Sequence, residues 1–130
     1  MKLEEFKVYQ LSMEIAEKIW VIVDGWDYFS KDTVGKQLVR AVDSVAANLS
    51  EGYGRYHFRE NINFGYYSRG SLSETKTWLT KARNRKLLTA PDYLLFNQQI
   101  DDIGIRLTNY IRSIGKTSNH KDNVQTNDNE

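Results

Sequence analysis

The sequence predicts an all-α protein, specifically an antiparallel up-down-up-down four-helix bundle. Four segments carry apolar residues at spacings of three and four, which is the pattern of amphipathic helices. No stretch alternates apolar and polar residues over a useful length, and the connections between the four segments are short. A length of 130 residues, with 40% hydrophobic and 27% charged residues, suits one domain with a single core.

The first helix is expected from about Glu4 to Trp26, and it carries two adjacent apolar stripes. One stripe consists of Val8, Leu11, Ile15, Ile19, Ile22 and Trp26, and the other of Tyr9, Met13, Ala16, Trp20 and Val23. Two stripes make an apolar face that is wider than one neighbouring helix covers.

The second helix is expected from about Asp32 to Tyr53, with Ser30 or Asp32 as the capping residue. Its core stripe consists of Leu38, Val42, Val45 and Leu49. We expect this helix to end near Gly52 and Gly54, because glycine tolerates the left-handed conformation that stops helices.

The third helix is expected from about Phe58 to Leu88, with Ile62, Leu72, Leu79 and Ala82 on one side. Gly65 and Gly70 interrupt it. Each glycine costs a helix about 1 kcal/mol relative to alanine. These glycines therefore predict close approach by a neighbouring backbone.

The fourth helix is expected from Pro91, which suits a first turn, to about Ile114. Its stripe consists of Phe96, Ile100, Ile103, Leu107, Tyr110 and Ile114. Gly115 is the expected stop. Residues 116–130 are almost wholly polar and are expected to be disordered, so the chain divides into a bundle of residues 1–115 and a tail.

Motifs for catalysis or for cofactor binding are not found in the sequence. It has no cysteine, and neither of its histidines, His57 and His120, follows a glutamate by three residues as in di-metal bundle sites. Gly52-Tyr53-Gly54 follows a helix, not a strand, so it lacks the context of a nucleotide-binding loop. We therefore expect a non-enzymatic protein without metal, cofactor or small-molecule substrate. The sequence also lacks a membrane span and a secretory signal, so a cytoplasmic location is expected.

Positive charge is concentrated in the middle of the chain, where residues 32–88 carry ten Lys or Arg and five Asp or Glu, a net +5. Two clusters there are candidate RNA-binding residues. The first mixes cations with Tyr56 and Phe58 and consists of Arg55, His57 and Arg59; the second lies at the end of the third helix and consists of Lys81, Arg83, Arg85 and Lys86. The alternatives are charge balance within the fold, cations that favour a helix C-terminus, and aromatic rings that plug the core.

The second helix also carries a polar stripe at spacings of four, three and four, made of Ser44, Asn48, Glu51 and Arg55. It is either a solvated face or an interfacial polar network that sets helix register. A surplus of Trp and Tyr, including Trp20, Tyr66 and Tyr67, exceeds what a thin bundle core hides and favours an oligomer interface.

Three segments resemble motifs of the four-helix-bundle proteins of the 23S rRNA intervening-sequence protein family. The segment Ala46 to Arg55, AANLSEGYGR, is similar to that family's P-A-N-I-A-E-G-x-G-R. Leu3 to Gln10 resembles its D-L-x-V-W-Q start, and Gly70-Ser71-Leu72-Ser73-Glu74 its G-S-L-x-E. The departures are Ala46 for proline, Ser50 for alanine and Tyr9 for tryptophan, and they put little in doubt about the fold.

The resemblance implies a bundle that assembles into a ring, typically a homopentamer. A more distant resemblance, to the accessory variability determinant protein of diversity-generating retroelements, implies nucleic-acid binding. The positions that match the family motifs and are expected to form a structural network are Asn48, Glu51, Gly52, Arg55, Ser71 and Glu74. Within it, we expect Arg55 to bond Glu51 or Glu74 and so to hold the second and third helices together. The alternative function is a structural or protein-interaction scaffold that has no nucleic-acid role.

Overall fold

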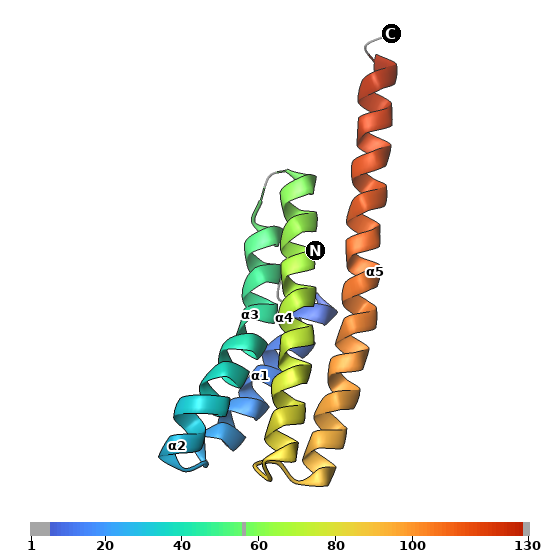
Figure 1. The fold of residues 1–130 in the computed structure, drawn as a ribbon. Helices are drawn as coiled ribbons and strands as arrows, with labels where there is room; N and C mark the ends of the chain where they lie inside the picture. Colours follow the sequence, from blue (N-terminus) through green and yellow to red (C-terminus); the bar gives the residue numbers. More distant parts are fainter. Residues whose placement is uncertain (1–5, 56, 129–130) are drawn as a thin grey trace.

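The fold is a four-helix bundle, as the apolar spacing predicts (Figure 1). The structure is a computed structural model that describes residues 6–55 and 57–128, with side chains as far as residue 115. The helices are α1 (Lys7–Asp24), α3 (Lys36–Tyr53), α4 (Phe58–Asn84) and α5 (Ala90–Asp128), which run alternately down and up the bundle. Two short segments, α2 (Tyr28–Ser30) and the π-helical η2 (Lys31–Gly35), lead into α3.

The core lies between the apolar stripes that the sequence predicts. Helix α3 packs against α1 and α4, and α5 packs against α4 and α1, so each helix has two neighbours. All four predicted residues of the α3 stripe are buried, and so are Leu79 of α4 and Leu107 of α5. Truncation of such a fully buried leucine to alanine typically costs about 2–5 kcal/mol.

The second stripe of α1 is covered only in part. Ala16 and Val23 are buried, whereas Met13 is 43% exposed and Trp20 is 55% exposed. Both exposed side chains lie toward α3 on the outside of the bundle, so the wide apolar face predicted for α1 extends beyond what its own chain covers.

The ends of two helices differ from the sequence prediction. Asp27, not Ser30 or Asp32, caps the second helical segment, because its carboxylate accepts a hydrogen bond from the Ser30 amide at 3.2 Å. Helix α4 stops at Asn84, before the predicted Leu88. Lys86 there adopts a left-handed conformation with φ of 62°, and the Leu87 amide bonds back to the Ala82 carbonyl at 2.8 Å. This is the Schellman arrangement that usually employs glycine.

The predicted stop at Gly115 is also wrong, because α5 continues to Asp128 and projects past the ends of the other helices (Figure 1). A glycine costs a helix only about 1 kcal/mol, and nothing lies within 4 Å of a Cβ built at Gly115 that would force the chain to turn. The division into a bundle of residues 1–115 and a disordered tail of residues 116–130 stays a prediction.

The structural roles of several glycines differ from those that the sequence predicts. No described glycine has a positive φ, so Gly52 and Gly54 do not stop α3 by a left-handed turn. Gly52 is instead the point of closest approach between α3 and α4, since a Cβ there would lie 2.7 Å from the Phe64 Cβ and 2.9 Å from the Asn61 Oδ1. Gly65 faces the Ile111 side chain, whereas Gly70, predicted to allow close backbone approach, has nothing within 4 Å.

Candidate nucleic-acid interface

The two predicted basic clusters lie at opposite ends of α4. The helix advances about 1.5 Å per residue, so Arg59 and Arg83 are about 36 Å apart along its axis. The cluster of Arg55, His57 and Arg59 surrounds the α3–α4 connection, and the cluster of Lys81, Arg83, Arg85 and Lys86 surrounds the α4–α5 connection. Tyr56, which was grouped with the first cluster, lies outside the described residues.

Arg55 is the most constrained member of the first cluster. Its guanidinium donates to the Glu51 carboxylate at 2.6 Å and lies 5.1 Å from the centroid of the Phe64 ring on α4. The predicted pairing with Glu51 is thus confirmed, but both residues precede α4, so the ion pair does not link α3 to α4. The Phe64 ring contact is what Arg55 contributes across the two helices. His57 and Arg59 are exposed.

The second cluster is built around two aromatic rings. The Arg83 guanidinium lies 4.4 Å from the centroid of the Tyr93 ring of α5, and the Lys81 ammonium lies 5.6 Å from that of Trp78. The Tyr93 hydroxyl is 3.3 Å from the Thr80 hydroxyl. These contacts hold cations beside ring faces at the protein surface, an arrangement that suits phosphate contact and base stacking.

Most of the cations predicted to bind RNA are not engaged by acids. The described ion pairs join Lys31 to Asp24, Arg55 to Glu51, Lys76 to Asp101 and Arg106 to Asp102. None of them involves Arg59 or a member of the second cluster. A cation without an acidic partner retains its full attraction for a phosphate.

The predicted polar network of the family motifs is not one connected cluster. The Asn48 amide donates to the Ser44 carbonyl, and Glu74 accepts from the Trp78 indole at 3.3 Å, so each bond stays within one helix. Ser71 is half-buried, and its carbonyl accepts from Thr75. Across the α3–α4 interface, the motif contributes the small size of Gly52 and the contact of Arg55 with the Phe64 ring.

Other residues make the polar links between helices. Buried Ser68 of α4 donates to the Val45 carbonyl of α3 at 2.8 Å, and the Tyr110 hydroxyl of α5 donates to Asn61 of α4 at 3.2 Å. Burial raises the pKa of Tyr110. Sequence reasoning missed these links because each joins residues that are 23 or 49 positions apart.

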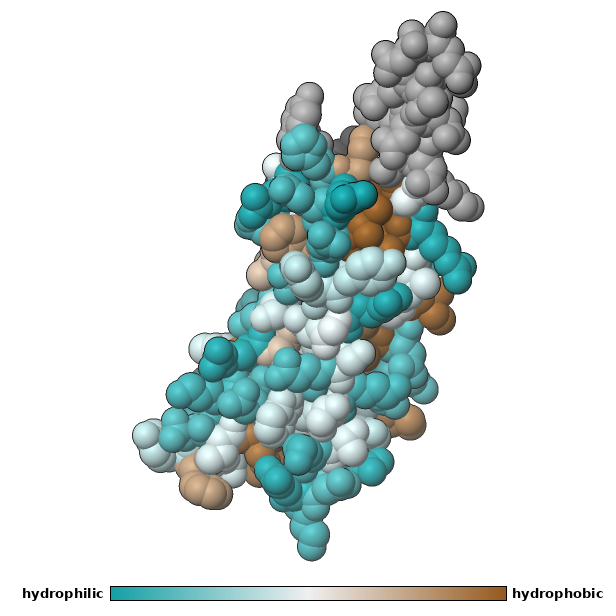
Figure 2. Space-filling model, turned by 45° about the horizontal axis from the view of Figure 1, so that its top comes forward, coloured by the Kyte–Doolittle hydropathy of each residue, from teal (hydrophilic) through white to brown (hydrophobic). Residues whose placement is uncertain are grey.

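Sequence reasoning also missed a groove between α4 and α5. It has a volume of about 650 Å³, and its cations are Arg69, Lys76 and Arg112. Arg69 and Lys76 are seven positions apart and therefore share a face of α4. That spacing was a usable signal, but the α5 partners could not be assigned without the register between the two helices. Figure 2 shows a mostly hydrophilic face with pale, near-neutral residues along its middle and a hydrophobic patch in its upper part.

Among the described residues, no three His, Cys, Asp or Glu side chains gather as they would around a metal ion. No helix in that part of the chain combines the length and the apolar character needed to cross a bilayer.

The family model described as 23S rRNA-intervening sequence protein matches residues 4–109. The chain belongs to this family. No curated protein matches. A solved structure of a protein of unknown function from the S23 ribosomal protein family of Bacteroides thetaiotaomicron is similar, with a TM-score of 0.73 at 22% identity over 81% of this chain and 95% of that one. At this identity the likeness shows the shared bundle fold.

Proposed function

We propose that this member of the 23S rRNA-intervening sequence family is a non-enzymatic protein that binds RNA and works as a homo-oligomer. The observation that carries the proposal is the character of α4. This helix bears five cations and two acids, and each of the four cation–ring contacts in the described residues involves one of its side chains. A helix with this surface offers phosphate partners and stacking rings along the whole length of the bundle.

The RNA-binding surface includes the two predicted basic clusters. Since they lie about 36 Å apart on one subunit, one short RNA segment does not reach both clusters unless it runs along α4. In a ring, each cluster would recur on every subunit, and weak contacts would add through avidity. The homopentamer implied by the family resemblance is the assembly that we propose.

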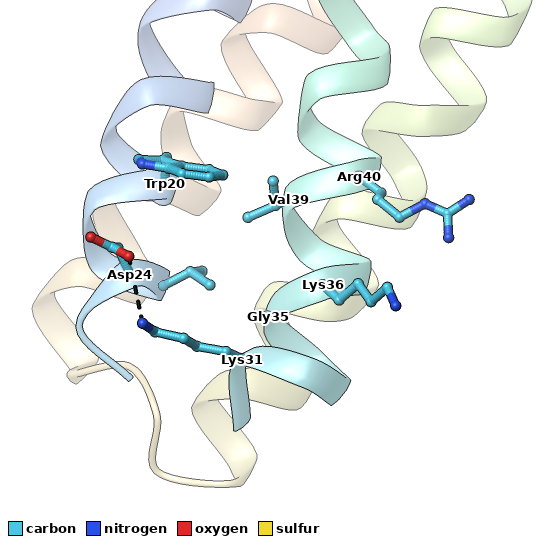
Figure 3. A pocket seen from close by; sticks show the side chains of 8 residues that line it. Trp20, Asp24, Lys31, Gly35, Lys36, Val39 and Arg40 are labelled. Atoms are coloured by element: carbon cyan, nitrogen blue, oxygen red, sulfur yellow. Dashed lines mark hydrogen bonds and ion pairs between the residues drawn. The ribbon is translucent and has the colours of Figure 1, made fainter. Parts of the chain in front are cut away.

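The α1–α3 face supports self-association (Figure 3). Trp20 of α1 and Val39 of α3 point toward one another across a hollow of about 350 Å³ whose exposed lining is mainly apolar. Further along the same face, a second hollow of about 390 Å³ includes Met13 and the acidic pair Glu17 and Asp43. Large exposed apolar side chains such as Trp20 typically mark interfaces.

The charges on the α1–α3 face favour a second copy of the chain as its binding partner. Lys36 and Arg40 lie beside the hollow at Trp20, whereas Glu17 and Asp43 lie beside the other hollow. The basic part and the acidic part can each attract the opposite charge on a neighbouring copy, and in a ring the partner surface is a second, different face of that copy. The alternative function is a scaffold for a different protein without a nucleic-acid role. It would use the same apolar face, but it gives the α4 cations no binding role.

The experiment that tests the proposal is a titration of purified protein with a fluorescently labelled structured RNA at several salt concentrations. We expect binding in the micromolar range near physiological salt and a steep loss of affinity as salt rises, because each phosphate contact releases counterions. No binding at 50 mM salt would refute the RNA role and favour the scaffold. Light scattering on the same sample tests assembly, and a monomer at micromolar concentration would contradict the oligomer. RNA recovered with the protein from cells under native conditions would then identify the partner.

A further inference from the structure

The groove between α4 and α5 has the form of a track for an extended anionic chain. Arg69, Ser73 and Lys76 line its α4 side, and Asp101, Thr108 and Arg112 line its α5 side. Ser73 and Lys76 also line an adjoining hollow of about 400 Å³ that continues to Lys81. The two hollows therefore adjoin along α4 at Ser73 and Lys76.

We propose that this groove binds the sugar–phosphate backbone of single-stranded RNA, an inference that rests on the proposed RNA-binding function and gives it a specific path. The lining includes four cations, Arg69, Lys76, Lys81 and Arg112, and one carboxylate, Asp101. Asp101 is paired with Lys76 at 2.9 Å, so the other three cations face the groove without an acid among its lining residues. A net charge of +3 in a concave surface concentrates anions.

The dimensions of the groove match a single strand. From Arg69 to Lys81 the helix advances about 18 Å, which a stacked strand covers in about five nucleotides at 3.4 Å each. Packed helices lie about 8–10 Å apart, so the depression between α4 and α5 is too narrow for a duplex to enter. Hydroxyl and amide groups of Ser73, Thr108 and Asn109 can bond the sugar and phosphate oxygens between the cations.

An exposed aromatic ring stands at one end of the groove. Tyr66 is 46% exposed and lies one helical turn before Arg69, whose guanidinium is 4.9 Å from the ring centroid. Exposed rings provide stacking partners for unpaired bases regardless of sequence. At the other end, Lys81 lies against Trp78, which lies one turn before it. The groove therefore has a ring beside a cation at each end, and its Lys81 end reaches the second predicted cluster.

The groove is hollow because its walls are small. A Cβ added at Gly104 would meet only the Leu72 side chain at 3.6 Å, which is ordinary contact, and Ser73 faces it from α4. Larger residues at these positions would narrow the depression, and a side chain at position 104 would contact Leu72 of the core.

The test measures binding of a labelled 15-nucleotide oligouridine by fluorescence anisotropy between 50 and 300 mM salt. Three variants are compared with the wild-type protein: Arg69→Gln with Arg112→Gln, Arg83→Gln with Arg85→Gln, and Asp101→Asn. The control is Arg106→Gln, which removes one exposed cation of α5 that is paired with Asp102 and does not line the groove. Circular dichroism verifies that each variant is folded, and light scattering gives its oligomer size.

Each phosphate contact is worth on the order of eightfold in affinity at 50 mM salt and about 0.7 in the slope of log affinity against log salt. The Arg69 and Arg112 double variant should therefore lose at least tenfold in affinity and about 1.4 in slope. Asp101→Asn should bind up to about eightfold more tightly, because it frees Lys76 and removes the carboxylate of the groove. The control should bind like the wild type, and a duplex of the same length should compete poorly.

Four results would overturn the inference, and they differ in whether they also affect the proposed RNA-binding function. Normal binding by the Arg69 and Arg112 variant beside weak binding by the Arg83 and Arg85 variant would remove the groove and leave the RNA function intact. Competition by duplex as strong as by single strand would contradict the single-strand path. Simultaneous loss of oligomer and of binding would make the groove a subunit interface. A wild-type protein that binds no RNA would refute both proposals together.

Discussion

Replacement of Gly52 by alanine tests how α3 and α4 are packed. A Cβ at this position would lie 2.7 Å from the Phe64 Cβ, 2.9 Å from the Asn61 Oδ1 and 3.3 Å from the Asn61 carbonyl oxygen. Two of these atoms belong to the backbone or are attached to it, so the obstruction cannot be relieved by a rotamer change alone. The helices must separate, and overpacking of this kind typically costs about 1–3 kcal/mol.

The gain in helix propensity partly offsets this cost. Alanine stabilises a helix interior by about 1 kcal/mol relative to glycine. Subtracting this gain from an overpacking cost in the upper part of its range leaves a net destabilisation of roughly 1–2 kcal/mol for Gly52→Ala. Gly70→Ala is the matched control, because Gly70 is exposed within α4 and has nothing within 4 Å. It should be stabilising by about 1 kcal/mol. The two variants should therefore differ by about 2–3 kcal/mol in opposite directions from the wild type.

The assay is thermal unfolding followed by circular dichroism at one protein concentration, since self-association makes Tm depend on concentration. For a domain of this size about 1 kcal/mol shifts Tm by roughly 4 °C, so the two midpoints should lie roughly 8–12 °C apart. A Gly52→Ala protein as stable as Gly70→Ala would refute the close approach of the two helices at Gly52.

Three further predictions follow from single residues. Lys86→Gly should be stabilising by about 1 kcal/mol in chemical denaturation, because glycine adopts the positive φ of 62° without strain, and an unchanged midpoint would contradict the left-handed turn. Desolvation and the nearby Glu17 raise the pKa of Asp43 above its usual 3.8. A raised carboxyl pKa makes the free energy of unfolding fall as the pH rises through the folded-state pKa. Asp43→Asn should therefore raise Tm at pH 7, and this gain should vanish as the pH falls below 4. A gain in Tm that persists in acid would exclude the electrostatic cause. Trp20→Ser should reduce oligomer size in light scattering, whereas Val21→Ser, at a 70% exposed position of the same helix, should leave it unchanged; equal effects would show that the α1–α3 face is not the interface.

The fold was predictable because it depends on local periodicity. The stripe of Leu38, Val42, Val45 and Leu49 identifies the buried face of α3 without knowledge of its neighbours. Helix ends were less predictable, because several residues near each end could cap or stop the helix. Asp27, Ser30 and Asp32 all have capping side chains, and of the three it is Asp27 whose carboxylate accepts a first-turn amide hydrogen.

The roles of glycines and charged residues depend on contacts that the sequence does not specify. Gly52 matches a helix-stop pattern, yet its function comes from Phe64 and Asn61 of another helix. The basic clusters were visible as runs of nearby residues. The groove was not visible in the sequence, because it combines Arg69 and Lys76 of α4 with Arg112 of α5. Only the register between the two helices brings these residues together.

The central claim, that RNA lies along α4, is tested most directly by photo-cross-linking on the unaltered protein. A single-stranded RNA that contains 4-thiouridine is irradiated with the wild-type chain, and the cross-linked peptides are located by mass spectrometry. We predict cross-links at Tyr66 and at residues around Arg69, Lys81 and Arg112, with the yield falling as salt rises. Cross-links confined to the α1–α3 face, or none above the level of an unrelated protein, would contradict it.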